Sequence, residues 1–133
     1  MPEAIALRVG EAPAPKALQD LRESVGWDAA AEDYPRAFSR YSTMVAGYAP
    51  DGTLIAWAAL ISDDVRHAFF VDVIVHPDHQ RRGHGRRLVE AAIRAEHVRG
   101  TSLIHVDFAT EHAAFYRACG FTTGGGGFMS FAS

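Results

Sequence analysis

The sequence predicts a single α/β domain built on a mixed sheet, and three observations lead to this prediction. The chain has 133 residues, a length that fits one domain with its own hydrophobic core. Hydrophobic residues make up 48% of it and charged residues 22%, as in ordinary globular proteins. From residue 67 onward, segments alternate in the order strand, helix, strand, helix, strand. This alternation is typical of crossover connections in an α/β sheet, so we expect one domain over residues 1–133.

Composition and charge exclude several classes of protein. The net charge of −3 gives no general attraction to nucleic acid or to an anionic membrane. Cys119 is the only cysteine, so no disulfide can form within the chain. Residues 1–4 carry no positive side chain ahead of an apolar run, and the longest apolar run, Leu54 to Ile61, is too short to span a bilayer. We therefore expect a cytoplasmic protein without a signal peptide.

The first part of the chain predicts one strand and two helices. The strand covers Ala4 to Val9. After the prolines at positions 13 and 15, apolar residues recur at helical spacing, and Gly26 is expected to end this helix. A second, short helix is expected to start near Pro35, because proline is tolerated in a first helical turn. The apolar positions of the first helix are Leu18, Leu21 and Val25.

The middle of the chain predicts three strands in succession. They run from Thr43 to Tyr48, from Thr53 to Ile61 and from His67 to Val75, and the third is rich in β-branched and aromatic residues. Residues 49–52, Ala-Pro-Asp-Gly, predict the first turn, because proline presets φ and glycine accepts a positive φ. Residues 62–64, Ser-Asp-Asp, predict the second turn.

The last part of the chain alternates between helix and strand. A long amphipathic helix is expected from Gly83 to Arg99, followed by a strand from Leu103 to Phe108. A short helix from Glu111 to Cys119 comes next. The glycine run from Gly124 to Gly127 is interpreted as a turn before a last short strand, Phe128 to Phe131.

The start of the long helix has an unusual composition. Gly83 and Gly85 stand where Ser, Thr, Asp or Asn would cap a helix. Cations at the positive end of a helix dipole are unfavourable by roughly 0.3–1 kcal/mol each, and the first amides lack intrahelical partners. Both costs disappear when an anion binds, because glycine lets backbone amides approach a phosphate and arginine neutralises its charge. The surrounding cations are Arg81, Arg82, Arg86 and Arg87.

A solvated basic turn that binds nothing is the alternative interpretation of this segment. No Gly-Lys-Ser/Thr follows, which argues against a P-loop. The glycines do not fit the dinucleotide-binding pattern G-x-G-x-x-G either. The position between a strand and a helix favours a phosphate or pyrophosphate site over a bare turn.

Two motifs resemble those of a known family. The stretch from Val75 to Gly85, V-x-P-x-x-Q-x-x-G-x-G, resembles the acetyl-CoA-binding motif of the GNAT superfamily of N-acetyltransferases. The stretch from Phe115 to Phe121, F-Y-x-x-x-G-F, resembles a second segment of the same family. The motifs occur in the family's order, and with the order of elements the resemblance covers roughly Thr43 to Phe131. Residues before Thr43 match the family only in the type of secondary structure that they predict.

The resemblance implies a fold and a cofactor. The fold is a largely antiparallel sheet of about six or seven strands with about four helices, splayed at the central parallel strands. Acetyl-CoA is the implied cofactor, and no metal is implied. The backbone of Val73 and Val75 would pair with the pantetheine arm, and amides from Arg81 to Arg86 would cradle the pyrophosphate. The implied cofactor-binding residues are Val73, Ile74, Val75, Gln80, Arg81, Arg82, Gly83, His84, Gly85 and Arg86.

Tyr116 is the catalytic residue that the resemblance implies. In this family a tyrosine at that position often protonates the departing CoA thiolate; packing of the short helix on the sheet is the structural alternative. Many relatives carry an asparagine where this chain has Ala109, so one side-chain contact near Tyr116 is absent here. The amine is expected to attack the thioester directly, and Cys119 is interpreted as a small core residue.

The general base is left open by the sequence. Asp72 is one candidate, on the strand that leads to the cofactor loop, although each candidate also suits a structural role and a water chain could serve instead. His76, His79 and His84 have no Cys or HExxH pattern nearby, so no metal is expected. The other candidates for the base are Asp63, Asp64, His67 and His105.

The acceptor side is expected near the first two helices. Acidic residues beside Trp27 and Tyr34 suit a cationic amine, and they suit an ordinary helix surface equally well. The acids are Asp28, Glu32 and Asp33. The expected reaction is acetyl transfer from acetyl-CoA to a primary amine of a small molecule or peptide, and the resemblance makes a homodimer plausible. The alternatives are a non-catalytic acyl-CoA-binding sensor and a nucleic-acid-binding module, which the acidic net charge disfavours.

Overall fold

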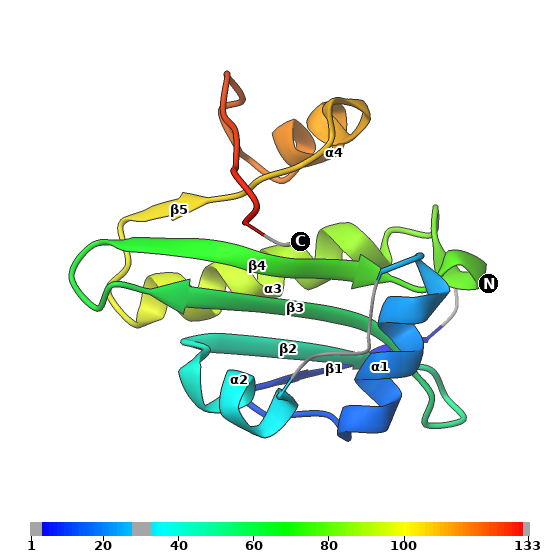
Figure 1. Ribbon diagram of the computed structural model, residues 1–133. Coiled ribbons are helices and arrows are strands. Elements are labelled where there is room, and N and C mark those ends of the chain that lie inside the picture. The colour runs from blue at the N-terminus through cyan, green and yellow to red at the C-terminus, as the bar shows by residue number, and fades with distance from the viewer. Residues whose placement is uncertain (1–3, 28–32, 132–133) are drawn as a thin grey trace.

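The computed structural model describes residues 4–27 and 33–131, and their elements follow the predicted order (Figure 1). Within these residues, five strands form one sheet in the order β1-β2-β3-β4-β5, antiparallel except for the parallel pair β4 and β5. The strands are β1 (Ala6–Val9), β2 (Thr43–Tyr48), β3 (Leu54–Ser62), β4 (His67–Val75) and β5 (Leu103–His105). The helices are α1 (Pro15–Ser24), α2 (Tyr34–Arg40), α3 (His84–Val98) and α4 (Ala113–Ala118), with 3₁₀ turns η1 (Pro77–His79) and η2 (Thr110–His112).

The predicted mixed α/β fold is confirmed, but three details of the prediction were wrong. The described residues form five strands rather than six or seven, and residues 128–131 are not a strand. Phe128 and Phe131 there are 84% and 91% exposed. Four β-prone residues do not form a strand unless a neighbouring strand pairs and packs with them. For the same reason β5 stops at His105 instead of Phe108, because its pairing with β4 ends there.

Helices cover both faces of the sheet (Figure 1). In this view α1 and α2 lie in front of the sheet and α3 lies behind it, while α4 rises beyond β5. On the α3 side, Leu88 and Val89 pack against Leu60 of β3. On the other side, Leu18 of α1 packs with Trp57, which is 0% exposed. The helices α1 and α3 therefore present the apolar stripes that their sequences predicted.

A bulge in β4 shapes the centre of the sheet. Ala59 pairs with Asp72, whereas the next residue of β3, Leu60, pairs with Phe70, so Val71 has no partner on β3. Because successive side chains of a strand point to opposite faces, one extra residue moves all later side chains to the other face. Phe70 accordingly packs on the α3 side, and Asp72 faces the side of α1 and α2.

The bulge also separates β4 from β5. A bulge bends its strand and increases the local twist. The parallel pairing of β4 with β5 joins Phe69 to His105 and continues no further. Among residues 4–27 and 33–131, the C-terminal half of β4 therefore pairs with β3 on one side and with no strand on the other, an open edge that is the splay the resemblance implied.

Candidate functional site

The open edge of β4 exposes backbone groups of two residues that the sequence singled out. The amide of His76 donates to the carbonyl of Ile55 on β3 at 2.8 Å. Since backbone groups alternate in direction along a strand, those of Val75 and Val73 point away from β3, toward the open edge. Ile74 differs, because its backbone faces β3 and its side chain, 2% exposed, belongs to the core.

The loop after β4 is tied back to the end of the strand. The side-chain amide of Gln80 donates to the carbonyl of Val75 at 2.9 Å. Arg81 and Gly83 have positive φ values of 64° and 84°. An arginine rarely adopts this conformation, so the loop holds Arg81 in a strained backbone geometry. Arg81 and Arg82 are both exposed at this turn.

The N-cap residue of α3 provides no side-chain cap. Gly83 occupies the N-cap position in the left-handed conformation and has no side chain to bond to the first amides of the helix. The first turn contains no acidic residue, although α3 is 15 residues long. Arg86 pairs with Glu90 one turn later, with 2.9 Å between Nε and Oε1. The helix start is therefore as electrostatically incomplete as the sequence predicted.

The two sequence motifs touch at Gly85. A Cβ on Gly85 would lie 3.2 Å from the ring of Phe115, which belongs to the second motif. Gly85 thus allows Phe115 of α4 to pack closely against the start of α3, where a Cβ would force the ring to shift by a few tenths of an ångström. The sequence predicted a role for Gly85 only in the approach of a phosphate, because the Phe115 contact joins residues far apart in the chain.

His84 is buried, unlike a histidine on an exposed surface loop. Its side chain is 3% exposed and packs into the protein at the first position of α3. Only its backbone is therefore available to a ligand at the helix start.

Tyr116 lies on α4 within a group of aromatic rings. It is 7% exposed, stacks on Phe108 at 4.8 Å between ring centroids, and meets Phe115 and Phe121 edge to face. Burial raises the pKa of Tyr116 to about 12, with a smaller contribution from Cys119. The phenol therefore keeps its proton at neutral pH and is a proton donor. Burial also raises the pKa of the Cys119 thiol, which makes it a poor nucleophile.

Asp72 is held by donors from two other elements. Its side chain is 8% exposed. Nη1 of Arg22 on α1 lies 3.3 Å from Oδ1 and 3.2 Å from Oδ2, and the indole N–H of Trp57 donates to Oδ2 at 3.1 Å. The carboxylate is thus engaged on both oxygens.

The other candidate bases have structural partners as well. Asp63 accepts the backbone amides of Val65, Arg66 and His67 in the turn between β3 and β4. These bonds lower the pKa of Asp63 to about 2, which makes it a weak base. His67 and His105 contact each other, with 2.9 Å between their ring nitrogens.

The two predicted acceptor-side residues have different surroundings. Trp27, just after α1, is 39% exposed, and its ring lies 5.2 Å from the guanidinium of Arg22. Tyr34, the first residue of α2, is 6% exposed and stacks on Phe38 in the core. Asp33 caps α2 by accepting the amide of Arg36. The predicted residues Asp28 and Glu32 lie outside the described part of the chain.

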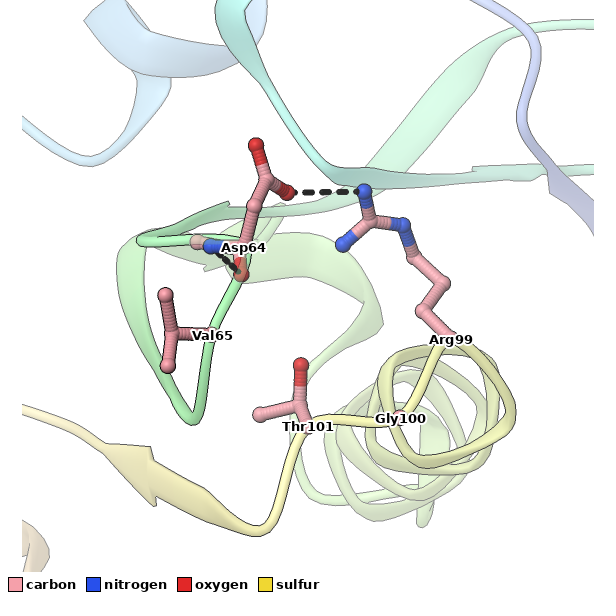
Figure 2. A pocket seen from close by; sticks show the side chains of 6 residues that line it. Asp64, Val65, Arg99, Gly100 and Thr101 are labelled. Carbon is pink, nitrogen blue, oxygen red and sulfur yellow. Dashed lines mark hydrogen bonds and ion pairs between the residues drawn. The ribbon is translucent and has the colours of Figure 1, made fainter.

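Hollows elsewhere on the surface do not coincide with these residues. Figure 2 shows a small one of about 70 Å³ near the C-terminal end of α3, where Asp64 and Arg99 point toward each other and pair at 3.3 Å. A larger one, about 470 Å³, lies beside β1 and the turn around Pro50. Neither is lined by the loop before α3 or by α4.

Residues 4–27 and 33–131 contain neither a metal cluster nor a membrane span. No three His, Cys, Asp or Glu side chains gather there as they would around a metal ion. None of the helices in this part of the chain has the length and apolar character needed to cross a membrane.

Comparisons with known proteins agree with the fold. The family model described as "Acetyltransferase (GNAT) domain" matches residues 40–123. A GNAT-family acetyltransferase from Streptococcus pneumoniae is 21% identical with a TM-score of 0.79, over 97% of this chain and 100% of that one. Glucosamine-6-phosphate N-acetyltransferase from Arabidopsis thaliana is 14% identical with a TM-score of 0.80, over 98% and 100%.

A third similar structure contains a ligand. AAC(6')-Iy, solved with the bisubstrate analogue CoA-S-monomethyl-acetylneamine, is 17% identical with a TM-score of 0.75, over 98% of this chain and 99% of that one. A search of the curated proteins found no match.

Proposed function

Because the chain belongs to the GNAT acetyltransferase family, we propose that it transfers an acetyl group from acetyl-CoA to a primary amine of a small molecule or peptide. One observation carries the proposal. The uncapped, arginine-rich start of α3 directly follows the open edge of β4 along the chain. The first feature suits a pyrophosphate, and the second suits an extended amide-containing arm. Coenzyme A contains both groups.

The residues at this place fit coenzyme A. Amides of the turn from Arg81 to Arg86 would hold the pyrophosphate, and the exposed guanidinium groups would neutralise it. Gln80 would serve indirectly, because its bond to the Val75 carbonyl fixes the loop against the strand. Val73 would offer its amide and carbonyl to the pantetheine arm at the open edge.

The chemistry then needs a proton donor and a proton acceptor. Acetyl-CoA supplies an acetyl thioester, which an amine can attack directly with release of a thiolate. Tyr116 holds its proton at neutral pH, so it can donate a hydrogen bond to the leaving sulfur. Because its raised pKa lies above that of a free thiol, full transfer of the proton to the thiolate is uphill, and the hydrogen bond is the stabilisation that we propose. The amine must lose a proton as its bond to the acetyl carbon forms. We do not propose Asp72 as the base, because Arg22 and Trp57 already engage its carboxylate, and a water chain is the simpler acceptor.

The proposed acceptor class rests on two kinds of support. Two similar structures carry names that refer to amine substrates, glucosamine-6-phosphate in one and an acetylneamine analogue in the other. In this chain Trp27, just after α1, is 39% exposed, and a cation already lies against its ring in the form of the Arg22 guanidinium. An exposed aromatic ring that accepts one cation suits a cationic amine as well.

The test is a panel of amines assayed for release of CoA thiol, together with calorimetry of CoA binding. Tyr116→Phe is expected to lower kcat by about 10²-fold or more, a typical effect for a positioned proton donor, while the Kd for CoA stays within a few-fold. Tyr48→Phe on β2 is the matched control and should change neither value. Spectrophotometric titration of tyrosine should show one group that ionises near pH 12 in the wild type and is missing in Tyr116→Phe.

Two results would change the proposal. If no amine accelerates thiol release although CoA binds tightly, the chain is an acyl-CoA-binding sensor rather than an enzyme. If CoA does not bind at all, the pyrophosphate site is refuted. A homodimer and a cytoplasmic location stay predictions, and light scattering and cell fractionation check them.

A further inference from the structure

Arg22, Trp57 and Asp72 form a buried polar cluster, here called the Arg22–Asp72 clasp, that joins α1 to the centre of the sheet. Its side chains come from α1, β3 and β4. The Arg22 and Asp72 side chains are only 13% and 8% exposed. The ring of Trp27 lies against the guanidinium of Arg22, at the end where α1 stops. The clasp is thus a nearly dry ion pair bridging two elements 50 residues apart in sequence.

Stability alone does not explain such a pair. Taking two charges out of water costs several kcal/mol, and apolar replacements of similar volume are often as stable or more so. What a buried pair adds is geometry, because both oxygens of the carboxylate must meet donors in fixed directions. The clasp therefore fixes where Asp72 sits relative to α1 and β3.

The position of Asp72 in β4 connects the clasp to the open edge of the strand. Asp72 directly follows the bulged residue, Val71, and directly precedes Val73, whose backbone points to the open edge. Beyond Phe69 the strand has a neighbour on one side only. The ladder to β3 holds this part of β4 from one side, and the bulge interrupts that ladder at Val71, so the Asp72 side chain adds an anchor from the face of the sheet next to the irregularity.

We propose that Arg22 and Asp72 are positioning residues for acetyl transfer. They hold the edge of β4 at Val73 in a fixed relation to α1 and to Trp27 on the acceptor side. Neither side chain touches the reacting atoms. This inference rests on the proposed function, in which the edge of β4 lines the acetyl donor and α1 borders the acceptor.

The decisive variant is the apolar exchange Arg22→Met/Asp72→Leu. It removes both charges together, so no buried charge is left without a partner. The buried indole N–H of Trp57 loses its acceptor, so the free energy of unfolding should fall by about 1–3 kcal/mol, which urea unfolding measures so that the exchange rates can be compared at known stability. Its Kd for CoA should stay within about threefold, since the pyrophosphate loop is untouched, while kcat falls about tenfold or more. Amide hydrogen exchange at Asp72 and Ile74, whose backbone groups face β3, should become about tenfold faster.

The control is a second ion pair on the same helix. Lys16 and Asp20 pair at 2.7 Å on the exposed side of α1. Lys16→Met/Asp20→Leu should change neither kcat nor hydrogen exchange in β4. If the double exchange in the clasp does not fold, Arg22→Lys replaces it, since it keeps the charge and loses the planar fork. It should then lower kcat without changing the Kd for CoA.

The readouts separate this inference from the proposed function. Wild-type kcat and wild-type exchange rates in the double variant would overturn the positioning role while leaving the acetyltransferase proposal intact. If the wild type neither binds CoA nor releases thiol, the proposed function fails. Hydrogen exchange in the double variant still decides whether the clasp holds the β4 edge. Exchange rates equal to those of the wild type would refute that role of the clasp.

Discussion

The two ends of α3 differ in whether the protein itself provides partners for the charged side chains placed there. At the N-terminus, Gly83 provides no side-chain cap and arginines crowd the positive end of the helix dipole. Near the C-terminus, Glu96 is 0% exposed and lies at the negative end, where a carboxylate is unfavourable. Hydroxyl groups of the protein itself bond to this carboxylate. The donors are Ser42, Thr43 and Thr101.

This difference shows which end of the helix is complete without a ligand. Burial raises the pKa of Glu96, but the hydroxyl hydrogen bonds outweigh it, helped by Arg99 at 3.6 Å, so the pKa lies below its ordinary value. Arg99 also pairs with Asp64 across the small hollow in Figure 2. The C-terminal end is therefore closed by contacts that stabilise the fold. At the N-terminal end, the N-cap residue has no side chain and the first turn has no acidic residue, and we propose that a bound anion supplies comparable contacts there.

The largest expected effect comes from removing the Glu96 carboxylate near the C-terminal end of α3. Glu96→Ala should lower the free energy of unfolding by about 3–5 kcal/mol, because it leaves buried hydroxyl groups without their acceptor. Urea unfolding measures this loss. Glu90→Ala on the same helix is the control and should cost less than about 1 kcal/mol, since its pair with Arg86 is exposed. If Glu96→Ala lowered the free energy of unfolding by less than about 1 kcal/mol, the contacts of Glu96 would not stabilise this end of α3 as the comparison requires.

Substitutions at the N-terminal end of α3 should change the affinity for CoA more than they change the stability of the protein. Arg81→Gln/Arg82→Gln should raise the Kd for CoA by about 100-fold, because each arginine that is replaced removes a charge-assisted hydrogen bond that accounts for about tenfold in affinity. The free energy of unfolding without ligand should change by less than about 1 kcal/mol, because both side chains are exposed and interactions of exposed charges are weak. Arg94→Gln, farther along α3, should leave the Kd unchanged. A clear decrease in ligand-free stability in the double variant would argue that the arginines have structural partners.

A pair of glycine variants compares the two ends directly. Gly83 and Gly100 both have positive φ values, 84° and 106°. Replacing either with Ala should cost about 1–2 kcal/mol of stability, because a Cβ strains this conformation. Only Gly83→Ala should also weaken CoA binding, by several-fold. Equal effects on binding would remove the functional distinction between the ends.

The smallest expected effect is a dependence of stability on acid pH. Because the pKa of Glu96 is lowered in the folded protein, its contribution is present above the ordinary glutamate pKa and is lost as pH falls through the folded value. Glu96→Gln should therefore flatten the acid side of the stability profile measured by urea unfolding. The Arg81→Gln/Arg82→Gln variant should keep the wild-type slope there. A wild-type slope in Glu96→Gln would mean that other carboxylates cause it.

Much of the fold could be predicted from local sequence. The strand from His67 to Val75 and the strand from Thr43 to Tyr48 have the predicted bounds, because β-branched runs and turns rich in Gly and Pro are local signals. The uncapped start of α3 was also visible, since cap and dipole preferences depend only on the nearest residues. The strand predicted at Phe128–Phe131 failed because strand formation needs a distant partner.

What the sequence determined by itself was the order of elements, the family motifs and a helix that begins among arginines and glycines. The tertiary structure alone decided that Val71 forms a bulge, that Phe115 packs on Gly85, and that Asp72 bonds to Arg22. Periodicity and turn chemistry act over a few neighbouring residues and can be recognised in one sequence. Register, ring packing and buried ion pairs join residues tens of positions apart, so they are fixed only when the sheet and its helices assemble.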